Sequence, residues 1–509
     1  MASTKTLLYY GALLHDVGKV LYRSMPQDSG PSVLGADFIA RDVASRNKRF
    51  AGGDGRLIAE QIRHHHPEEF DVASGFAEDS LAYITCFANS VAAGGVTTEG
   101  DDPRADAPRL GSRLQRIFNT LNGHHDDAVI EHQGYEVIQA RLLEDLSRVA
   151  VSEQGCGELL DLLEVSLSAI PATIHEDALN DVSLYDHSKT VAGIAVCVYE
   201  YLSQSGVTDY RQALFSEGTG ADPNAKDMFL LYSCDMSGIQ DFIYNISGSG
   251  ALKQLRARSM YLELLLEHVV DELLQRVGLN RCNLLYTGGG HAYLLLPHTE
   301  RTLAELRRFD GELREWFVEH YRTDLYVASA WVSCCADDLA NRGSDKRRYP
   351  SLYRRLSRGL SEAKAKRYDA RTIRELNFGA HKDFDHSREC SECHRSDLHL
   401  DQDDKCTLCA SLGLISKSLI DKDVFVVELG EDADDVHISR PGLALPFGCQ
   451  LRMYAHEDFL RRRPQARRIY AKNDVTLPGH AATRIWMGDY MAETGEEGIS
   501  AYAVALIER

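Results

Sequence analysis

Two Cys-x-x-Cys pairs that lie twelve residues apart set the tightest limit on the fold of this chain. Their members are Cys390, Cys393, Cys406 and Cys409. Four thiolates paired in this way converge tetrahedrally on one Zn²⁺, and the filled shell leaves no position for a catalytic water. The intervening HRSDLHLDQDDK is too polar to form a core, so we expect metal to organise it. The spacing favours a structural zinc module over the alternative of four unligated thiols.

Length and composition restrict the class of protein. A chain of 509 residues exceeds the size at which one core stops growing, which predicts three or four domains. Twelve cysteines without a secretory signal favour reduced thiols and metal binding, and they predict a cytoplasmic protein. The net charge of −20 argues against a protein that coats nucleic acid indiscriminately. No apolar run approaches the ~20 residues that span a bilayer, so no membrane partner is expected.

Hydrophobic periodicity predicts an α+β protein of several domains. Residues 1–125 have helical periodicity, and so do residues 126–215, which we interpret as a helical linker region. Residues 216–350 have the order strand–helix–strand–strand–helix–strand, which is ferredoxin-like. Residues 351–425 are a helical region in which charged segments flank the cysteine pairs of a zinc ribbon. Residues 426–509 alternate strands, turns and one basic helix, which predicts an α+β segment.

A second candidate metal site combines a His-Asp pair with a run of three histidines. His15 and Asp16 end an apolar helical segment, Lys19 follows, and His64–His66 come after another such segment. Imidazole and carboxylate suit Mn, Fe, Co, Ni or Zn, and such metals activate water for attack on phosphodiesters. Lys19 can neutralise the phosphate. A His-Asp pair alone is more often a satisfied polar pair at a helix end, but the histidine run favours a metal site.

A series of further motifs follows along the chain. It comprises Leu14–Lys19, Leu34–Phe38, Ile62–His66, Asp181–Thr190, Ser237–Tyr244, Leu252–Tyr261, Tyr286–Pro297, the cysteine pairs, Tyr470–Asn473 and Trp486–Tyr490. These motifs resemble, in type and order, those of the large subunit of type III-A (Csm-type) CRISPR interference complexes, the Cas-ten family. The resemblance covers essentially the whole chain. It implies an RNA-guided effector subunit in antiviral defence, with other type III-A subunits, crRNA, target RNA, single-stranded DNA and ATP as partners.

The resemblance implies that residues 1–125 form an HD domain that cleaves single-stranded DNA with the help of a metal. The metal would be a divalent transition ion such as Mn²⁺, Ni²⁺ or Co²⁺. Its implied ligands are His15, Asp16, His65 and His66, and the implied catalytic residues are His15, Asp16 and Lys19.

Two positions depart from the family's pattern in this region. Pro31-Ser32 stands where the family usually has His-Ser, and Ala88-Asn89-Ser90 stands where it usually has Ala-Asp-Asn. Proline is not a metal ligand, and an amide is a weaker, uncharged ligand than a carboxylate. The departures therefore predict slow cleavage or none.

The resemblance also implies that residues 216–350 form the first of two palm domains related to nucleotide cyclases. Its share of an ATP pocket would come from Ser237, Gly238, Ile239, Gln240 and the turn Gly288, Gly289 and Gly290. This turn corresponds to a catalytic GGDD hairpin, but without carboxylates it cannot hold Mg²⁺. Mg²⁺/ATP and cyclic oligoadenylate synthesis would therefore need a second palm, which is expected beyond Arg509. On spacing alone the turn fits an ordinary hairpin equally well.

Two other patterns are interpreted as structural. Asp186-His187, beside Ser188 and Thr190, indicates a capping and packing cluster at a helix start rather than a catalytic pair. Gly52–Gly55 superficially matches GGDD, but it lies between helical segments and has no flanking strands.

Three functions remain open from the sequence. The first is an effector-complex subunit that carries nuclease and cyclase parts. The second is a free-standing HD-type nucleotide phosphohydrolase whose remaining residues are regulatory. The third is an inert architectural subunit, which Pro31 and Asn89 favour.

Overall fold

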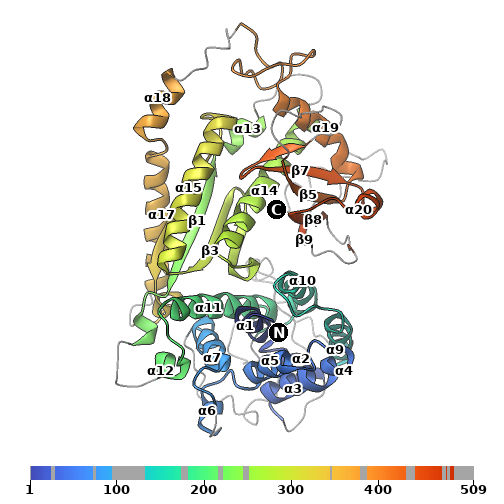
Figure 1. The fold of residues 1–509 in the computed structure, drawn as a ribbon, viewed down its shortest axis with the longest axis vertical. Coiled ribbons are helices and arrows are strands. Elements are labelled where there is room, and N and C mark those ends of the chain that lie inside the picture. The colour runs from blue at the N-terminus through green and yellow to red at the C-terminus, as the bar shows by residue number, and fades with distance from the viewer. Residues whose placement is uncertain are drawn as a thin grey trace, which may run out of the picture.

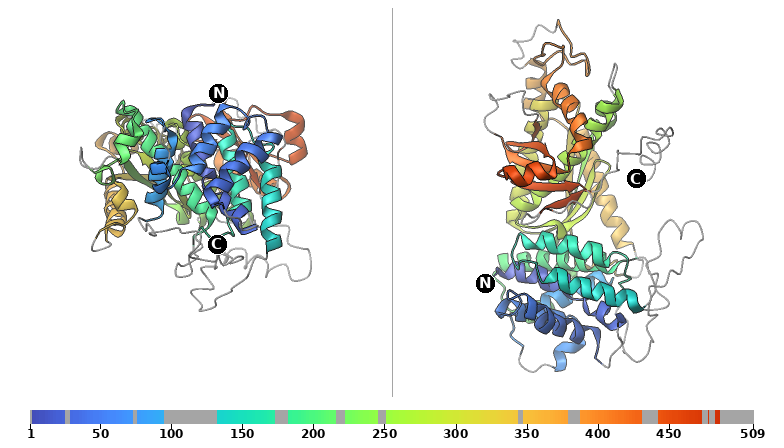
Figure 2. Two further views of the ribbon diagram at one scale, coloured as in Figure 1. Left: turned by 90° about the horizontal axis from the view of Figure 1, so that it is seen from below. Right: turned by 90° about the vertical axis from the view of Figure 1, so that its right-hand side faces the viewer.

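The fold combines a helical part with two β-sheets, as a computed structural model of the chain describes it (Figures 1 and 2). The structure describes residues 2–24, 29–72, 76–94, 132–172, 182–215, 222–244, 251–343, 347–378, 387–430, 442–472, 477 and 482–485. Several predicted positions lie outside these ranges, namely 95–125 of the expected HD domain, Asp181, Asn473 and Trp486–Tyr490.

The helical part occupies one end of the molecule (Figure 1). Its elements are α1 (Thr4–Leu14), α2 (Gly18–Ser24), α3 (Pro31–Asp37), a π-helical turn (Phe38–Val43), α4 (Ala44–Arg46), α5 (Gly53–Arg63), α6 (Glu68–Val72), α7 (Leu81–Ala92), α9 (His132–Leu146), α10 (Gly155–Leu167), α11 (Leu184–Gln204) and α12 (Tyr210–Phe215). α1 packs against α5 and α11, and α7 packs against α11. The described residues of the stretch predicted as a helical linker are helical, and they share one apolar core with the first helices.

Local sequence explains where the central helices begin and why they are buried. Ser3, Ser80 and Ser183 each precede a helix and accept a hydrogen bond from a backbone N–H of its first turn. In α1 every residue from Thr6 to Leu14 is buried, which is typical of a helix that lies inside a core. The residue that follows this buried helix is His15, so the candidate site lies deep in the protein.

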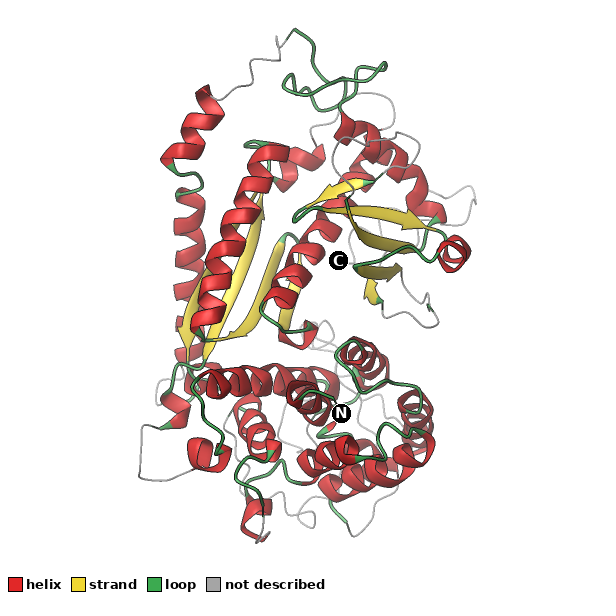
Figure 3. Cartoon of the chain, in the orientation of Figure 1, coloured by secondary structure: helices red, strands yellow, loops and turns green. Residues whose placement is uncertain are grey.

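The first sheet has four strands in the order β2-β3-β1-β4, and every neighbouring pair is antiparallel (Figure 3). Its elements are β1 (Phe229–Ser237), α13 (Ile239–Tyr244), α14 (Ala251–Arg276), β2 (Leu284–Gly288), β3 (His291–Pro297), α15 (Glu300–Tyr321) and β4 (Tyr326–Cys334), with short 3₁₀ turns at Pro223–Ala225 and Arg281–Asn283. The predicted strand–helix–strand–strand–helix–strand order is confirmed. All of the central strand β1 except Ser237 is buried, which explains why apolar residues dominate its first half.

Four helices lead from this sheet to the second one. They are α16 (Ala336–Leu339), α17 (Arg348–Ala365), α18 (Ala370–Phe378) and α19 (Thr407–Asp421). α17 packs along β4 and β1, and α19 packs against α14. The second cysteine pair lies at the start of α19, and the packing of α19 against α14 therefore fixes its position relative to the first sheet.

The second sheet has five strands in the order β6-β7-β5-β8-β9. Its elements are β5 (Val424–Leu429), β6 (Leu443–Leu445), β7 (Cys449–Tyr454), α20 (His456–Arg462), β8 (Arg468–Lys472) and β9 (Thr483–Ile485). Ion pairs hold it to α14, because Arg467 and Arg468 each contact the buried carboxylate of Glu272 at 2.8 Å. The expected multidomain mixture of helices and sheets is therefore confirmed. In the described ranges no helix has both the length and the apolar character needed to cross a membrane.

Candidate metal centres and nucleotide site

A buried carboxylate lies among three imidazoles in the helical part. Asp16 follows the end of α1 and stands beside His15, while His65 follows α5 and His187 lies in the first turn of α11. The Nε2 atoms of His15, His65 and His187 lie 3.3, 3.5 and 3.5 Å from the carboxylate oxygens of Asp16. The Asp16 side chain is 3% exposed and that of His187 is 12% exposed, so the cluster is almost closed to water.

The orientation of two rings leaves their Nε2 atoms available to a metal. His15 Nδ1 lies 2.8 Å from the carbonyl oxygen of Ala12, and His65 Nδ1 lies 2.7 Å from that of Ile62. Because a carbonyl only accepts, Nδ1 carries the proton in each ring. Both Nε2 atoms are buried without a hydrogen-bond partner. Lone pairs that face a carboxylate repel it unless a cation lies between them, so this arrangement fits a metal ion.

Electrostatics favour an ionised Asp16 and neutral imidazoles at His65 and His187. Burial by itself raises the pKa of Asp16, but Lys19 and His15 outweigh it and hold this pKa well below its usual range. The Lys19 ammonium donates to Asp16 Oδ2 at 2.7 Å and to a backbone carbonyl at 2.9 Å. Burial lowers the pKa of His65, and burial together with His15 lowers the pKa of His187 to about 3. A carboxylate with neutral imidazoles is a donor set for divalent transition metals.

The structure places a different histidine in this group from the one that the sequence predicts. Among the described residues, His15, Asp16 and His187 have ligand atoms within 4.8 Å of one another. His65 and His66 both lie outside that group. His65 Nε2 is still 3.5 Å from Asp16, whereas the His66 ring packs on the His65 ring with centroids 4.1 Å apart. Burial and His65 lower the pKa of His66 to about 4.

The interpretation of Asp186-His187 holds for only one of the two residues. Asp186 is part of a cap, because its backbone N–H donates to Ser183 Oγ at 3.0 Å and its carboxylate accepts from that hydroxyl at 2.6 Å. His187 instead joins the buried cluster. The sequence offered no signal for this role, because only the packing of α11 against α1 brings His187 to Asp16.

Of the two departures from the family's pattern, Asn89 borders the cluster and Pro31 packs against Gly18. Asn89 Oδ1 lies 3.1 Å from His187 Nε2, and Asn89 Nδ2 donates to the His65 carbonyl at 3.4 Å. An amide oxygen only accepts, so His187 Nε2 carries a proton in this arrangement and would have to release it to bind a metal. The amide adds no negative charge to the cluster. Pro31 begins α3, and a Cβ on Gly18 would meet its carbonyl oxygen at 1.9 Å. Only glycine allows α2 to approach α3 this closely.

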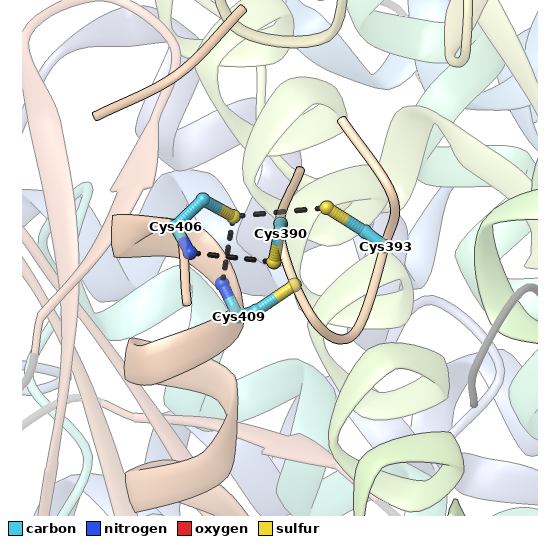
Figure 4. Close-up of side chains that lie close together, drawn as sticks. All are labelled: Cys390, Cys393, Cys406 and Cys409. Carbon is cyan, nitrogen blue, oxygen red and sulfur yellow. Dashed lines mark hydrogen bonds between the residues drawn. The ribbon is translucent and has the colours of Figure 1, made fainter. Parts of the chain in front are cut away.

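The four cysteines converge at the start of α19 (Figure 4). Cys406 is the N-cap of this helix and Cys409 lies in its first turn, while Cys390 and Cys393 come from the preceding loop. All four sulfur atoms lie within 4.8 Å of one another. The 3.8 Å between the Sγ atoms of Cys393 and Cys406 equals the edge of a tetrahedron whose metal–sulfur bonds are about 2.3 Å long. The cluster therefore fits a tetrahedral metal ion.

Hydrogen bonds favour thiolates in this cluster. The backbone N–H of Cys406 donates to Cys390 Sγ at 3.3 Å, and that of Cys409 donates to Cys406 Sγ at 3.5 Å. Hydrogen bonds from Cys393 and Cys409 lower the pKa of Cys406 to about 4, and hydrogen bonds to Cys393 and Cys406 raise the pKa of Cys409, so without a metal the negative charge is held at Cys406. Donors that point at sulfur stabilise its anionic form, which is the form that binds metals.

The two segments predicted to bind a nucleotide lie side by side. Ser237 ends β1, Gly238 follows, and Ile239 and Gln240 begin α13. The backbone N–H of Met236, the residue before Ser237, donates to the Gly290 carbonyl at 2.8 Å. A Cβ added to Gly290 would meet Ile239 Cδ1 at 2.3 Å. The turn between β2 and β3 therefore packs directly on the turn between β1 and α13.

The glycine turn is open at its tip, and a paired carboxylate lies at its base. Gly288, Gly289 and Gly290 have φ angles of 157°, 59° and 87°, and a Cβ on Gly289 would meet nothing within 4 Å. The Asp235 carboxylate, on β1, lies 3.1 Å from His291 Nε2 and also pairs with Lys364 of α17. An imidazole and an ammonium group therefore both engage the carboxylate at this edge.

Comparison with known proteins relates the whole described chain to one family. The family described as Csm1 subunit domain B matches residues 228–379, from the start of the first sheet to the end of α18. The Cas10/Csm1 protein of Enterococcus italicus, named a CRISPR system single-strand-specific deoxyribonuclease of subtype III-A, is 37% identical over 98% of this chain and 68% of its own length. The protein of the same name from Mycobacterium tuberculosis is 36% identical over 95% of this chain and 65% of its own length.

Solved structures of Csm1–Csm4 assemblies have a similar fold. The apo Csm1–Csm4 cassette matches with a TM-score of 0.67 and 24% identity, over 95% of this chain and 60% of that chain. The cassette in complex with pppApA matches with a TM-score of 0.66 and 26% identity over the same shares. This chain thus spans about two thirds of the length of its curated relatives. Because the identity and coverage extend over both sheets and the helical part, the chain belongs to the Cas10/Csm1 family of subtype III-A CRISPR systems.

Proposed function

We propose that this chain acts in the cytoplasm as the large subunit of a type III-A CRISPR effector complex in antiviral defence. The observation that carries the proposal is its similarity to Csm1 chains solved together with Csm4, over 95% of the chain. By this proposal it binds other type III-A subunits, crRNA and target RNA, and it acts on single-stranded DNA and ATP. Residues 1–125 would then be an HD domain, 216–350 a palm domain and 351–425 a region that contains a zinc ribbon.

The histidine–aspartate cluster would supply the nuclease chemistry. It would hold Mn²⁺, Ni²⁺ or Co²⁺ through His15, Asp16, His65 and His187. Such an ion, when bound, polarises a phosphodiester and activates water for its hydrolysis. The Nδ1 bonds to backbone carbonyls keep the rings of His15 and His65 turned toward the ion. Lys19 would neutralise charge on the phosphate, and His66 would act only through the ring of His65, on which it packs.

Cleavage of single-stranded DNA tests this proposal. With Mn²⁺ we expect slow cleavage by the wild-type chain, because Asn89 brings no negative charge to the ion. Asn89→Asp should raise the rate, since it adds a carboxylate beside His187. Asp16→Asn should lower the rate by at least about 100-fold, because metal ions stabilise such transition states by several kcal/mol and each ~1.4 kcal/mol is a factor of ten.

Asp186→Asn is the matched control, because this exposed carboxylate lies next to His187 but belongs to the helix cap. Its rate should equal that of the wild type. No cleavage by either the wild-type chain or Asn89→Asp would contradict the nuclease and favour an inert architectural subunit. Cleavage that survives Asp16→Asn would place the activity elsewhere.

The four-cysteine cluster would hold Zn²⁺ in a structural role. Its four sulfur ligands complete a tetrahedron and leave no position for water. The polar loop before α19 would then be ordered by the ion, and the ion would fix this loop against the end of α15, where Arg395 donates to the His320 carbonyl at 2.9 Å.

The turns Ser237–Gln240 and Gly288–Gly290 would form half of an ATP pocket. We expect this chain to bind ATP weakly and to make no cyclic oligoadenylate, because the glycine turn has no carboxylate to hold Mg²⁺ and Asp235 is already engaged by His291 and Lys364. Incubation with ATP and Mg²⁺ or Mn²⁺, followed by mass spectrometry, measures the product directly. Oligoadenylate above a heat-treated control would contradict this expectation, and it would indicate another carboxylate pair.

A further inference from the structure

A buried arginine joins the four-cysteine cluster to α13. Arg258 lies on α14, and only 2% of its surface is exposed. Its Nη2 donates to Cys409 Sγ at 3.4 Å, and its Nη1 donates to the Phe242 carbonyl at 2.6 Å. Its guanidinium also lies over the Phe242 ring, 5.2 Å from the centroid. One side chain therefore contacts both a metal-ligand sulfur and the helix that follows the Ser237–Gly238 turn.

The strength of this contact depends on whether the cluster holds a metal. A divalent ion with four thiolates carries a net charge of about −2, because the four negative sulfurs outnumber its two positive charges. A guanidinium that donates to such a thiolate makes a charge-assisted bond, whereas a neutral thiol is only a weak acceptor. Metal in the cluster therefore stabilises Arg258 in the position from which it holds the Phe242 carbonyl.

A second set of contacts links the cysteine loop to the end of α15, and the segment after α15 packs on the Ser237–Gly238 turn. Arg395, two residues after Cys393, donates to the His320 carbonyl at 2.9 Å and pairs with Asp397. Asp397 in turn pairs with Arg322 at 3.2 Å. His320 and Arg322 lie at the end of α15, so the loop that the metal organises packs on the segment that leads into β4.

Gly238 packs tightly on that segment. Its φ angle is 91°, and a Cβ would meet the Asp324 carbonyl oxygen at 1.8 Å. The backbone N–H of Phe242 donates to the Gly238 carbonyl at 2.9 Å. The Ser237–Gly238 turn is thus held on one side through Asp324 and on the other through Phe242, and contacts of the cysteine module reach both sides.

We propose that Arg258 is a positioning residue through which metal in the four-cysteine module holds the Ser237–Gly238 turn and α13 in place. The inference rests on the proposed metal in the module, and it deepens the proposed nucleotide role of the turn. It predicts that the cysteine module and the nucleotide turn are energetically linked although no cysteine belongs to the turn.

Hydrogen–deuterium exchange on the full chain tests the link. In metal-loaded wild-type protein the amides of α13 should be protected, and removal of the metal should raise their exchange about 10-fold or more, as expected for loss of a hydrogen bond to a charged group. Arg258→Gln should reproduce this rise while the metal stays bound, and Arg258→Lys should restore part of the protection. Arg307→Gln removes an exposed arginine from α15 and is the matched control.

Cobalt gives a second readout that a merely structural arginine would not change. With Co²⁺ in the four-cysteine cluster, Arg258→Gln should shift the thiolate-to-cobalt absorption band, because the Cys409 sulfur loses a donor. Arg307→Gln should leave the band in place.

Two results would overturn the proposal. One is α13 exchange within about twofold of the wild type in metal-loaded Arg258→Gln, together with an unshifted cobalt band. The other, which does not depend on how this variant folds, is unchanged α13 exchange when metal is removed from the wild-type chain. ATP binding measured in parallel separates the two proposals. If amide exchange in α13 rises while the affinity for ATP stays constant, the link between the module and the turn is supported and the proposed nucleotide role of the turn is contradicted.

Discussion

Removal of the metal from Cys390, Cys393, Cys406 and Cys409 is expected to unfold the loop before α19 and to leave the helical part folded. The loop between the pairs is polar, and its buried contacts are mainly among the cysteines themselves and three leucines. Structural zinc contributes on the order of 10 kcal/mol to the folding of such modules, which exceeds what this loop can supply from apolar burial. The expected stoichiometry is one zinc per chain in protein purified without chelators.

Metal analysis combined with limited proteolysis measures this effect. Cys406→Ser should lose the zinc and expose cleavage sites within 387–409, because it removes both a ligand and the cap of α19. Cys86→Ser is the matched control, since Cys86 is a buried cysteine of α7 that lies outside the cluster. Full zinc content in Cys406→Ser, or no zinc in the wild-type chain, would contradict the prediction.

Replacement of His187 is expected to weaken metal binding at the second cluster far more than replacement of His66. His187 Nε2 lies 3.5 Å from Asp16, whereas His66 contacts the ring of His65. Loss of residues that merely orient a ligand lowers metal affinity by about 10–100-fold, so loss of a direct ligand should cost at least about 100-fold. We therefore expect His187→Gln to abolish Mn²⁺ or Ni²⁺ binding at micromolar metal and His66→Gln to lower affinity by about 10-fold or less.

Isothermal titration with Ni²⁺ on zinc-loaded protein distinguishes these variants, because the cysteine cluster is then already filled. Asn89→Ala is an informative third variant, since its amide only orients His187, and its loss should fall in the range of about 10–100-fold. Equal affinities for His187→Gln and the wild type would remove His187 from the ligand set. A larger loss for His66→Gln than for His187→Gln would restore the set predicted from the sequence.

Features that depend on neighbouring residues could be predicted from the sequence. The succession of strands and helices from β1 to β4 follows from apolar runs and helical periodicity, because each pattern reports how one element is buried. The spacing of Cys390, Cys393, Cys406 and Cys409 likewise predicts their convergence, since each pair lies on one turn of chain and a short loop joins the pairs. The glycine turn is also a local feature, because its φ angles suit only glycine.

Features that join distant segments depend on the tertiary structure. His187 reaches Asp16 because α11 packs on α1, and Arg258 reaches Cys409 because α19 packs on α14. Helical periodicity marks the buried face of α11 but does not identify the helix that covers it, so His187 beside Ser188 and Thr190 resembled part of a capping and packing cluster. The sequence also does not indicate that Arg258 is buried or what it contacts, because its role depends on which anion the fold brings within reach. The cysteine spacing thus determined one candidate metal site locally, and the packing of helices decided which residues belong to the other candidate site.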